Sequence, residues 1–153
     1  IVGGLEAFIG LPHRSALVRE IDAIKFIDDS KGTNVGAVVA ALSDYQGTAI
    51  PILGGDGKGQ DFRPLRFAVS ASCRAVILIG RDKEMIATVL KDLKIPMVLA
   101  GSMDDAVSAA FKIAKKGDAV ILSPGCASFD MFKDYKERAQ YFINSVNFLA
   151  ESL

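Results

Sequence analysis

The sequence predicts an α/β protein built on a Rossmann-like open sheet, mostly parallel, with helices on both faces. Short runs of β-branched and apolar residues alternate with longer segments in which apolar residues recur three and four positions apart. This alternation is typical of parallel strands joined by right-handed helical crossovers. The chain has 153 residues, 50% of them hydrophobic, which suffices for one folded core.

Six extended segments are expected in this sheet. The first two follow each other so closely, both before Asp28, that one of them is expected to pair antiparallel at an edge. Each of the other four stands between two helical segments, as the parallel arrangement requires. In chain order, the predicted strands are 16–19, 24–27, 48–53, 75–79, 97–99 and 119–122.

Five helices are expected to connect and follow these strands. The first is preceded by the capping residues Ser30, Thr33 and Asn34, and the second by Asp61. The predicted helices are 34–42, 62–70, 83–93, 103–115 and 133–151. The last is amphipathic, and one face is expected to pack on the sheet. That face carries Tyr135, Ala139, Phe142, Val146 and Leu149.

Charge and cysteine usage exclude several classes of function. The 18 basic residues balance the 18 acidic ones, so no broad field attracts nucleic acid or an anionic membrane. No apolar run reaches the roughly 18–20 residues that cross a bilayer. Cys73 and Cys126 have no CxxC spacing and the chain has one histidine, so no metal site is expected. We expect a soluble cytoplasmic protein with reduced thiols.

Three loops follow strands and precede helices, so they should meet at the carboxyl edge of the sheet, where ligands bind in such folds. We call them the Lys31 loop (28–34), the glycine loop (54–62) and the serine loop (123–132). The Lys31 loop combines a lysine with free amides at a helix N-terminus, which suits an anion. Taken alone, however, the loop favours the simpler interpretation of a plain helix cap with a solvated lysine.

The other two loops also leave alternatives open. The glycine loop has four glycines in six positions and Lys58, typical either of close approach to a ligand or of a flexible turn. Gln60 stands where a Walker loop needs lysine. In the serine loop, hydroxyls and amides could hold a carboxylate. Cys126 is expected to be a buried thiol rather than a nucleophile, because His13 is the one possible imidazole partner.

Four segments in order resemble the C-terminal domain of the Mur ligases of peptidoglycan synthesis. They are FIGLPHR (8–14), FIDDSKGTNVGA (26–37), ILGGDGKGQDF (52–62) and LSPGCASFDMFKDYKERAQYF (122–142). The resemblance runs over nearly all of the chain and is greatest to the D-glutamate-adding member. It implies residues 1–12 as the tail of a preceding central domain and a hinge, and 13–153 as the amino-acid-binding domain.

The resemblance implies an ATP-dependent amide ligase that adds D-glutamate to UDP-N-acetylmuramoyl-L-alanine through an acyl phosphate, with magnesium. In this family the C-terminal domain binds the amino acid and closes over ATP, which a central domain holds. The implied nucleotide contacts are Arg14 and Asp29. The implied D-glutamate contacts are Lys31, Thr33, Lys58, Ser128 and Tyr135, and Tyr135 stands where the family usually has Phe.

The resemblance assigns no catalytic or metal-binding residue to this chain, because the GxxGKT-type loop, the acidic magnesium ligands and the modified lysine of the central domain do not occur in it. We therefore expect a fragment that is inactive alone, from a monomeric bacterial enzyme. Gly32 and Gly125 stand where the family usually has Ala, Asp28 where Asn is common, and Ala139 where Gly is usual.

Two alternatives stay open at this point. The chain could be the corresponding domain of a sister Mur ligase or of a folylpolyglutamate-type ligase. It could also be a stand-alone α/β module that binds a small anion or nucleotide without turnover.

Overall fold

The computed structural model describes residues 15–153. Three predictions fall outside the described residues: the tail and hinge at 1–12, the nucleotide contact at Arg14, and the role of His13 in the entry segment.

The core of the fold is a six-stranded sheet in the order β1-β2-β6-β3-β4-β5. β1 pairs antiparallel with β2 at one edge, and all other neighbours are parallel. This confirms the mostly parallel sheet with one antiparallel edge strand. The strands are β1 (Ala16–Ile21), β2 (Ile24–Asp28), β3 (Ala49–Gly54), β4 (Val76–Ile79), β5 (Met97–Leu99) and β6 (Ala119–Leu122).

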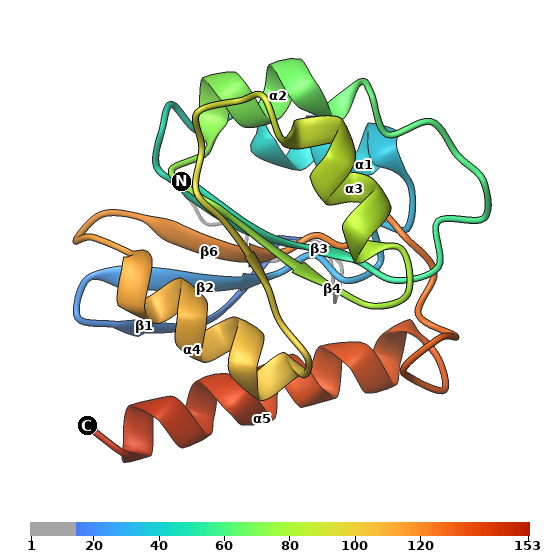
Figure 1. The fold of residues 1–153 in the computed structure, drawn as a ribbon. Coiled ribbons are helices and arrows are strands. Elements are labelled where there is room, and N and C mark those ends of the chain that lie inside the picture. Colours follow the sequence, from blue (N-terminus) through green and yellow to red (C-terminus); the bar gives the residue numbers. More distant parts are fainter. Residues whose placement is uncertain (1–14) are drawn as a thin grey trace.

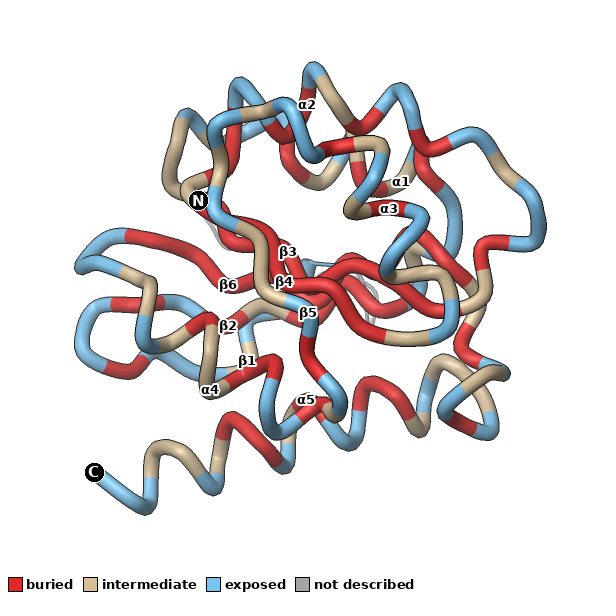
Figure 2. Tube along the Cα trace, in the orientation of Figure 1, coloured by how far each residue is buried: buried red, intermediate tan, exposed pale blue. Residues whose placement is uncertain are grey.

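Helices cover both faces of the sheet, as predicted (Figure 1). The first three helices lie on one face and the last two on the other, and each layer encloses an apolar cluster. The most deeply buried stretches of chain are the central strands between the layers (Figure 2). The helices are α1 (Val35–Leu42), α2 (Leu65–Ser72), α3 (Lys83–Leu90), α4 (Met103–Ile113) and α5 (Tyr135–Glu151). None of them is long and apolar enough to cross a membrane.

Every predicted element exists, and the differences lie at the ends. α2 begins at Leu65 rather than at 62, because the Asp61 carboxylate accepts a hydrogen bond from the Arg63 amide and holds a turn there. α5 begins after Asp134, whose side chain accepts from the Glu137 amide at 2.9 Å. Its predicted face is buried at Ala139, Phe142 and Val146, whereas Tyr135 and Leu149 at its two ends are half-buried.

The strand order decides where the three loops lie. β2, β6 and β3 are neighbours in the sheet, and they lead into the Lys31 loop, the serine loop and the glycine loop respectively. Because the three strands are parallel, the loops leave the sheet at the same edge, with the serine loop between the other two.

Candidate functional site

Backbone hydrogen bonds join the three loops directly. The Gly125 amide of the serine loop donates to the Gly32 carbonyl of the Lys31 loop at 3.1 Å. On the other side, Asp56 of the glycine loop and Ala127 of the serine loop exchange two backbone hydrogen bonds, at 3.0 and 2.9 Å. The loops therefore form one surface rather than three independent turns.

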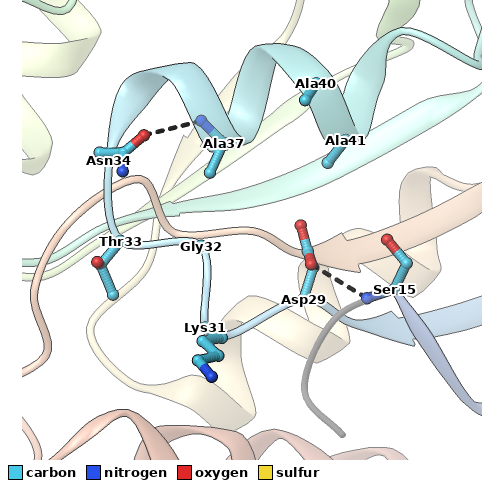
Figure 3. A pocket seen from close by; sticks show the side chains of 9 residues that line it. All are labelled: Ser15, Asp29, Lys31, Gly32, Thr33, Asn34, Ala37, Ala40 and Ala41. Carbon is cyan, nitrogen blue, oxygen red and sulfur yellow. Dashed lines mark hydrogen bonds between the residues drawn. The ribbon is translucent and has the colours of Figure 1, made fainter. Parts of the chain in front are cut away.

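The first cavity on this surface has a volume of about 400 Å³ and lies beside α1 (Figure 3). The Asp29 carboxylate is buried in its wall and accepts a hydrogen bond from the Ser15 amide at 3.0 Å. The Lys31 side chain is exposed and points away from α1. The cavity is lined by Ser15, Asp29, Lys31, Gly32, Thr33, Asn34, Ala37, Ala40 and Ala41.

A second cavity of about 260 Å³ adjoins the first, since Thr33 and Asn34 line both. All three loops contribute to it. Its lining residues are Thr33, Asn34, Asp56, Gly57, Lys58, Gln60 and Ala127. The two cavities thus bring Asp29, Lys31, Thr33 and Lys58, which lie up to 29 positions apart in the printed sequence, to one edge of the sheet.

Lys58 has an unusual backbone for a lysine. Its φ is +51°, in the left-handed region that favours glycine, within a turn closed by the Gln60 amide on the Gly57 carbonyl at 3.1 Å. The Lys58 ammonium lies 5.7 Å from the centre of the Phe129 ring, within cation–π range. This turn presents the ammonium group to solvent beside the second cavity.

The other two predicted substrate contacts lie at the margin. Ser128 is buried, and its carbonyl accepts from the amides of Met131 and Phe132. Tyr135 is the first residue of α5 and is half-buried. Neither residue lines the two cavities. Lys31, Lys58 and Thr33 therefore line the two adjoining cavities, whereas Ser128 and Tyr135 line neither of them.

Gln60 was not predicted as a site residue, and it joins the glycine loop to the start of α1 and to the serine loop. Its Oε1 accepts from the Val35 amide at the start of α1 at 3.0 Å, and its Nε2 donates to the Gly125 carbonyl at 2.7 Å. The Asn34 side chain accepts from the Ala37 amide at 2.9 Å. Side chains thus already engage two of the first amides of α1, as the plain-cap interpretation of the Lys31 loop requires, and these two amides are not free for an anion. In the sequence, the one indication of this role is that Gln60 near the end of the glycine loop has an amide side chain, which can donate and accept hydrogen bonds at the same time.

Part of the glycine loop is explained by packing alone. A Cβ on Gly54 would lie 1.9 Å from the Ile79 carbonyl oxygen, and one on Gly55 would lie 2.4 Å from the Ala127 carbonyl oxygen. These two glycines let the ends of β3 and β4 and the serine loop approach each other. The flexible-turn interpretation is therefore wrong for Gly54 and Gly55.

The positions that depart from the family pattern are accommodated locally. Gly125 has φ +70°, and a Cβ there would meet the Val38 side chain at 2.9 Å, so glycine relieves both strain and crowding. Gly32 lies in the wall of the first cavity. The Asp28 carboxylate accepts from the Ser30 amide at 2.9 Å. Ala139 is fully buried in the core.

The two cysteines are free and buried, which confirms the prediction of a buried thiol at Cys126. Burial raises the pKa of both Cys73 and Cys126 from 9.0 to about 12, so each stays protonated at neutral pH. Among residues 15–153, no cluster of three or more His, Cys, Asp or Glu side chains is placed to hold a metal ion.

The fold and the cavities together define an α/β domain with two adjoining cavities, each lined by a lysine, at the carboxyl edge of its sheet. The family described as Mur ligase, glutamate ligase domain matches residues 13–126. The chain therefore belongs to the Mur ligase family.

Relatives at about 50% identity support this membership. The chain is 52% identical over 151 residues to the UDP-N-acetylmuramoylalanine–D-glutamate ligase of Thiobacillus denitrificans, covering 98% of this chain and 32% of that protein. It is 51% identical to the ligase of the same name from Paraburkholderia xenovorans, covering 98% and 30%. The chain thus spans about a third of the length of these relatives.

Solved structures share the fold at low sequence identity. The UDP-N-acetylmuramate-alanine ligase of Thermotoga maritima aligns with a TM-score of 0.62 and 14% identity, over 95% of this chain and 32% of that one. The folylpolyglutamate synthase/dihydrofolate synthase of Yersinia pestis aligns with a TM-score of 0.59 and 16% identity, over 94% and 32%. A domain of a related putative ligase from Haemophilus ducreyi, solved by itself, aligns with a TM-score of 0.54 and 15% identity, over 87% of this chain and 99% of that one.

Proposed function

We propose that this chain is the amino-acid-binding C-terminal domain, residues 13–153, of an ATP-dependent ligase that adds D-glutamate to UDP-N-acetylmuramoyl-L-alanine in peptidoglycan synthesis. The observation that carries the proposal is the pair of exposed lysines, Lys31 and Lys58, on two adjoining cavities that share Thr33. Two separated cations suit a ligand with two carboxylates better than an apolar amino acid. The names of the relatives at about 50% identity point to the same substrate.

In this proposal each lysine binds one carboxylate of D-glutamate, and the Thr33 hydroxyl, between the two cavities, donates to one of them. Ser128 and Tyr135 support the amino acid from the serine loop and the start of α5. Asp29, in the wall of the first cavity, and Arg14 contact the ribose and phosphates of the nucleotide.

The contribution of this domain to the reaction is orientation. In the ligase, the carboxylate of UDP-N-acetylmuramoyl-L-alanine is first phosphorylated by ATP, and the amino group of D-glutamate then attacks the acyl phosphate and expels phosphate. Holding D-glutamate by both carboxylates leaves its amino group free to face that bond, which lowers the entropic cost of the encounter. ATP and magnesium are held mainly by the part of the ligase outside this chain, so the domain alone is inactive. We place the ligase, as a monomer, in the bacterial cytoplasm.

Two alternatives use the same fold. Sister Mur and folylpolyglutamate ligases have this architecture, so the choice among them depends on which amino acid the site accepts. A stand-alone binding module would bind a small anion without turnover. The D-glutamate reading is preferred because of the two lysines and the names of the relatives.

The test is steady-state kinetics of the full-length protein, with D-glutamate and ATP varied separately. Loss of a charge-assisted contact of about 1.5–3 kcal/mol predicts that Lys31→Met and Lys58→Met each lower kcat/KM for D-glutamate by about 10- to 150-fold. Ser128→Ala should have a smaller effect, and Lys112→Met on the exposed side of α4 serves as the control. Lysine variants with wild-type kinetics, or equal turnover with L-alanine, would reject the D-glutamate site.

A further inference from the structure

Arg138 is the largest side chain in the interior and lies in the first turn of α5. Only 1% of its surface is exposed. Burial lowers the pKa of its guanidinium to about 10, so the group is still charged at neutral pH. Burying a charge in this way is costly, and the contacts it makes should explain why an arginine stands there.

The guanidinium donates hydrogen bonds to the backbone of two loops and lies beside the third. Its Nη1 donates to the Cys126 carbonyl of the serine loop at 3.0 Å, and its Nη2 donates to the Ser30 carbonyl of the Lys31 loop at 3.2 Å. A Cβ placed on Gly55 of the glycine loop would lie 3.4 Å from Nη1. Ser30 directly precedes Lys31, and Cys126 is two residues before Ser128.

This arrangement is poor as a device for stability alone. Within the described chain, Arg138 Nε, Ser30 Oγ and Asp130 Oδ1 are buried without a hydrogen-bond partner. Buried polar groups left unsatisfied cost free energy, and apolar side chains of similar volume often replace buried charges at no loss of stability. What an apolar side chain cannot do is donate to two carbonyls on different loops from one planar group.

We propose that Arg138 is a positioning residue that fixes the Lys31 loop and the serine loop relative to each other, and thereby sets the spacing of the groups that bind the amino-acid substrate. The inference rests on the proposed function for the identity of that substrate. It does not require Arg138 to touch the substrate.

The experiment compares Arg138→Met and Arg138→Lys with Arg74→Met in the full-length protein. Arg74 is the matched control, because it also joins two segments of the fold, through Asp118 at 2.5 and 3.1 Å, but at the opposite edge of the sheet. Both Arg138 variants should lower kcat/KM for D-glutamate by about 10- to 100-fold, mainly through KM, since a displacement of about 1 Å costs that much. KM for ATP should change little, and Arg74→Met should show no such selectivity.

A second measurement does not depend on activity. Amide hydrogen exchange should become faster in residues 30–34 and 126–128 of the Arg138 variants than in the same residues of Arg74→Met. Arg138→Lys keeps the charge but not the planar two-donor geometry, so it carries the test if Arg138→Met fails to fold.

The outcomes separate the two proposals. A wild-type protein without D-glutamate-dependent phosphate release contradicts the proposed function, while the exchange data still test the positioning role. An active wild type whose folded Arg138 variants match Arg74→Met in KM and in exchange overturns the positioning role. Loss of folding in both Arg138 variants also overturns it, because Arg138 would then serve stability alone.

Discussion

At the scale of the residue, Lys58 combines a strained backbone with an exposed charge. A left-handed φ costs a non-glycine residue about 1–2 kcal/mol, and nothing in the packing of this exposed turn requires a lysine. Such strain is typical of functional positions, where the side chain is retained for what it binds. The strained turn therefore lowers the stability of the fold, and it places the Lys58 ammonium group beside the second cavity.

This predicts that the stability of a Lys58 variant depends on how well the new residue tolerates a left-handed backbone. The free energy of unfolding of Lys58→Asn should be about 1 kcal/mol higher than that of Lys58→Met, because asparagine tolerates the left-handed conformation and methionine does not. Both variants lose the cation–π contact with Phe129, so its loss does not contribute to the difference in stability between them. Urea unfolding of the two variants measures the difference. Equal stability would show that the turn is not strained.

The buried thiols predict a loss of stability in alkali. The thiols of Cys73 and Cys126 have a pKa of about 12 in the folded state, whereas in the unfolded chain their pKa is the ordinary value of 9.0. The unfolded state therefore binds fewer protons above pH 9, and the stability of the fold decreases as pH rises. Between pH 9 and 10 the two thiols together should cost about 2 kcal/mol. The check is urea unfolding at both pH values, with the Cys73→Ala, Cys126→Ala double variant expected to lose most of this slope.

At the scale of the element, the end of β3 is tied to the serine loop and lies close against the end of β4. Gly54 ends β3, has φ +125°, and donates its amide to the Pro124 carbonyl at 2.9 Å. Its close approach to the end of β4 leaves no room for a side chain. Gly47 also has a positive φ, +75°, but a Cβ there would meet nothing within 4 Å.

These two glycines form a matched pair for a test of packing against backbone strain. Gly47→Ala should cost only the strain, about 1–2 kcal/mol. Gly54→Ala adds a clash with a backbone carbonyl, so the total should be at least about 3 kcal/mol. Denaturant midpoints of the two variants measure the costs. If Gly54→Ala were no worse than Gly47→Ala, the strand ends would have to separate easily.

At the scale of the whole molecule, residues 15–153 form three layers with an apolar cluster on each face of the sheet. We expect the chain to fold alone and to unfold in a single cooperative transition. The Haemophilus ducreyi domain, which was solved by itself and is covered to 99%, has the same fold. Phosphate release from ATP, D-glutamate and UDP-N-acetylmuramoyl-L-alanine should stay at background. Several separate unfolding transitions, or enzymatic turnover, would contradict this prediction.

The sequence by itself determined the elements and the edge of the sheet where the candidate ligand site lies. Hydrophobic period distinguishes strand from helix locally, so all six strands and five helices were predictable. The lysines of the Lys31 loop and the glycine loop were visible because each follows a strand directly. The first residues of α2 and α5 could not be predicted from the sequence, because hydrogen bonds of the Asp61 and Asp134 side chains to backbone amides determine where these helices begin.

Only the tertiary structure decided the order in which the three loops lie side by side and what holds them together. The neighbouring positions of β2, β6 and β3 follow from the pairing of strands that are distant in the sequence. Gln60 and Arg138 join the three loops through backbone carbonyls and amides, and every residue offers those groups, so no sequence pattern marks their partners. Local structure depends on residues that are neighbours in the sequence, whereas a contact between backbone groups of distant loops exists only once the chain has folded.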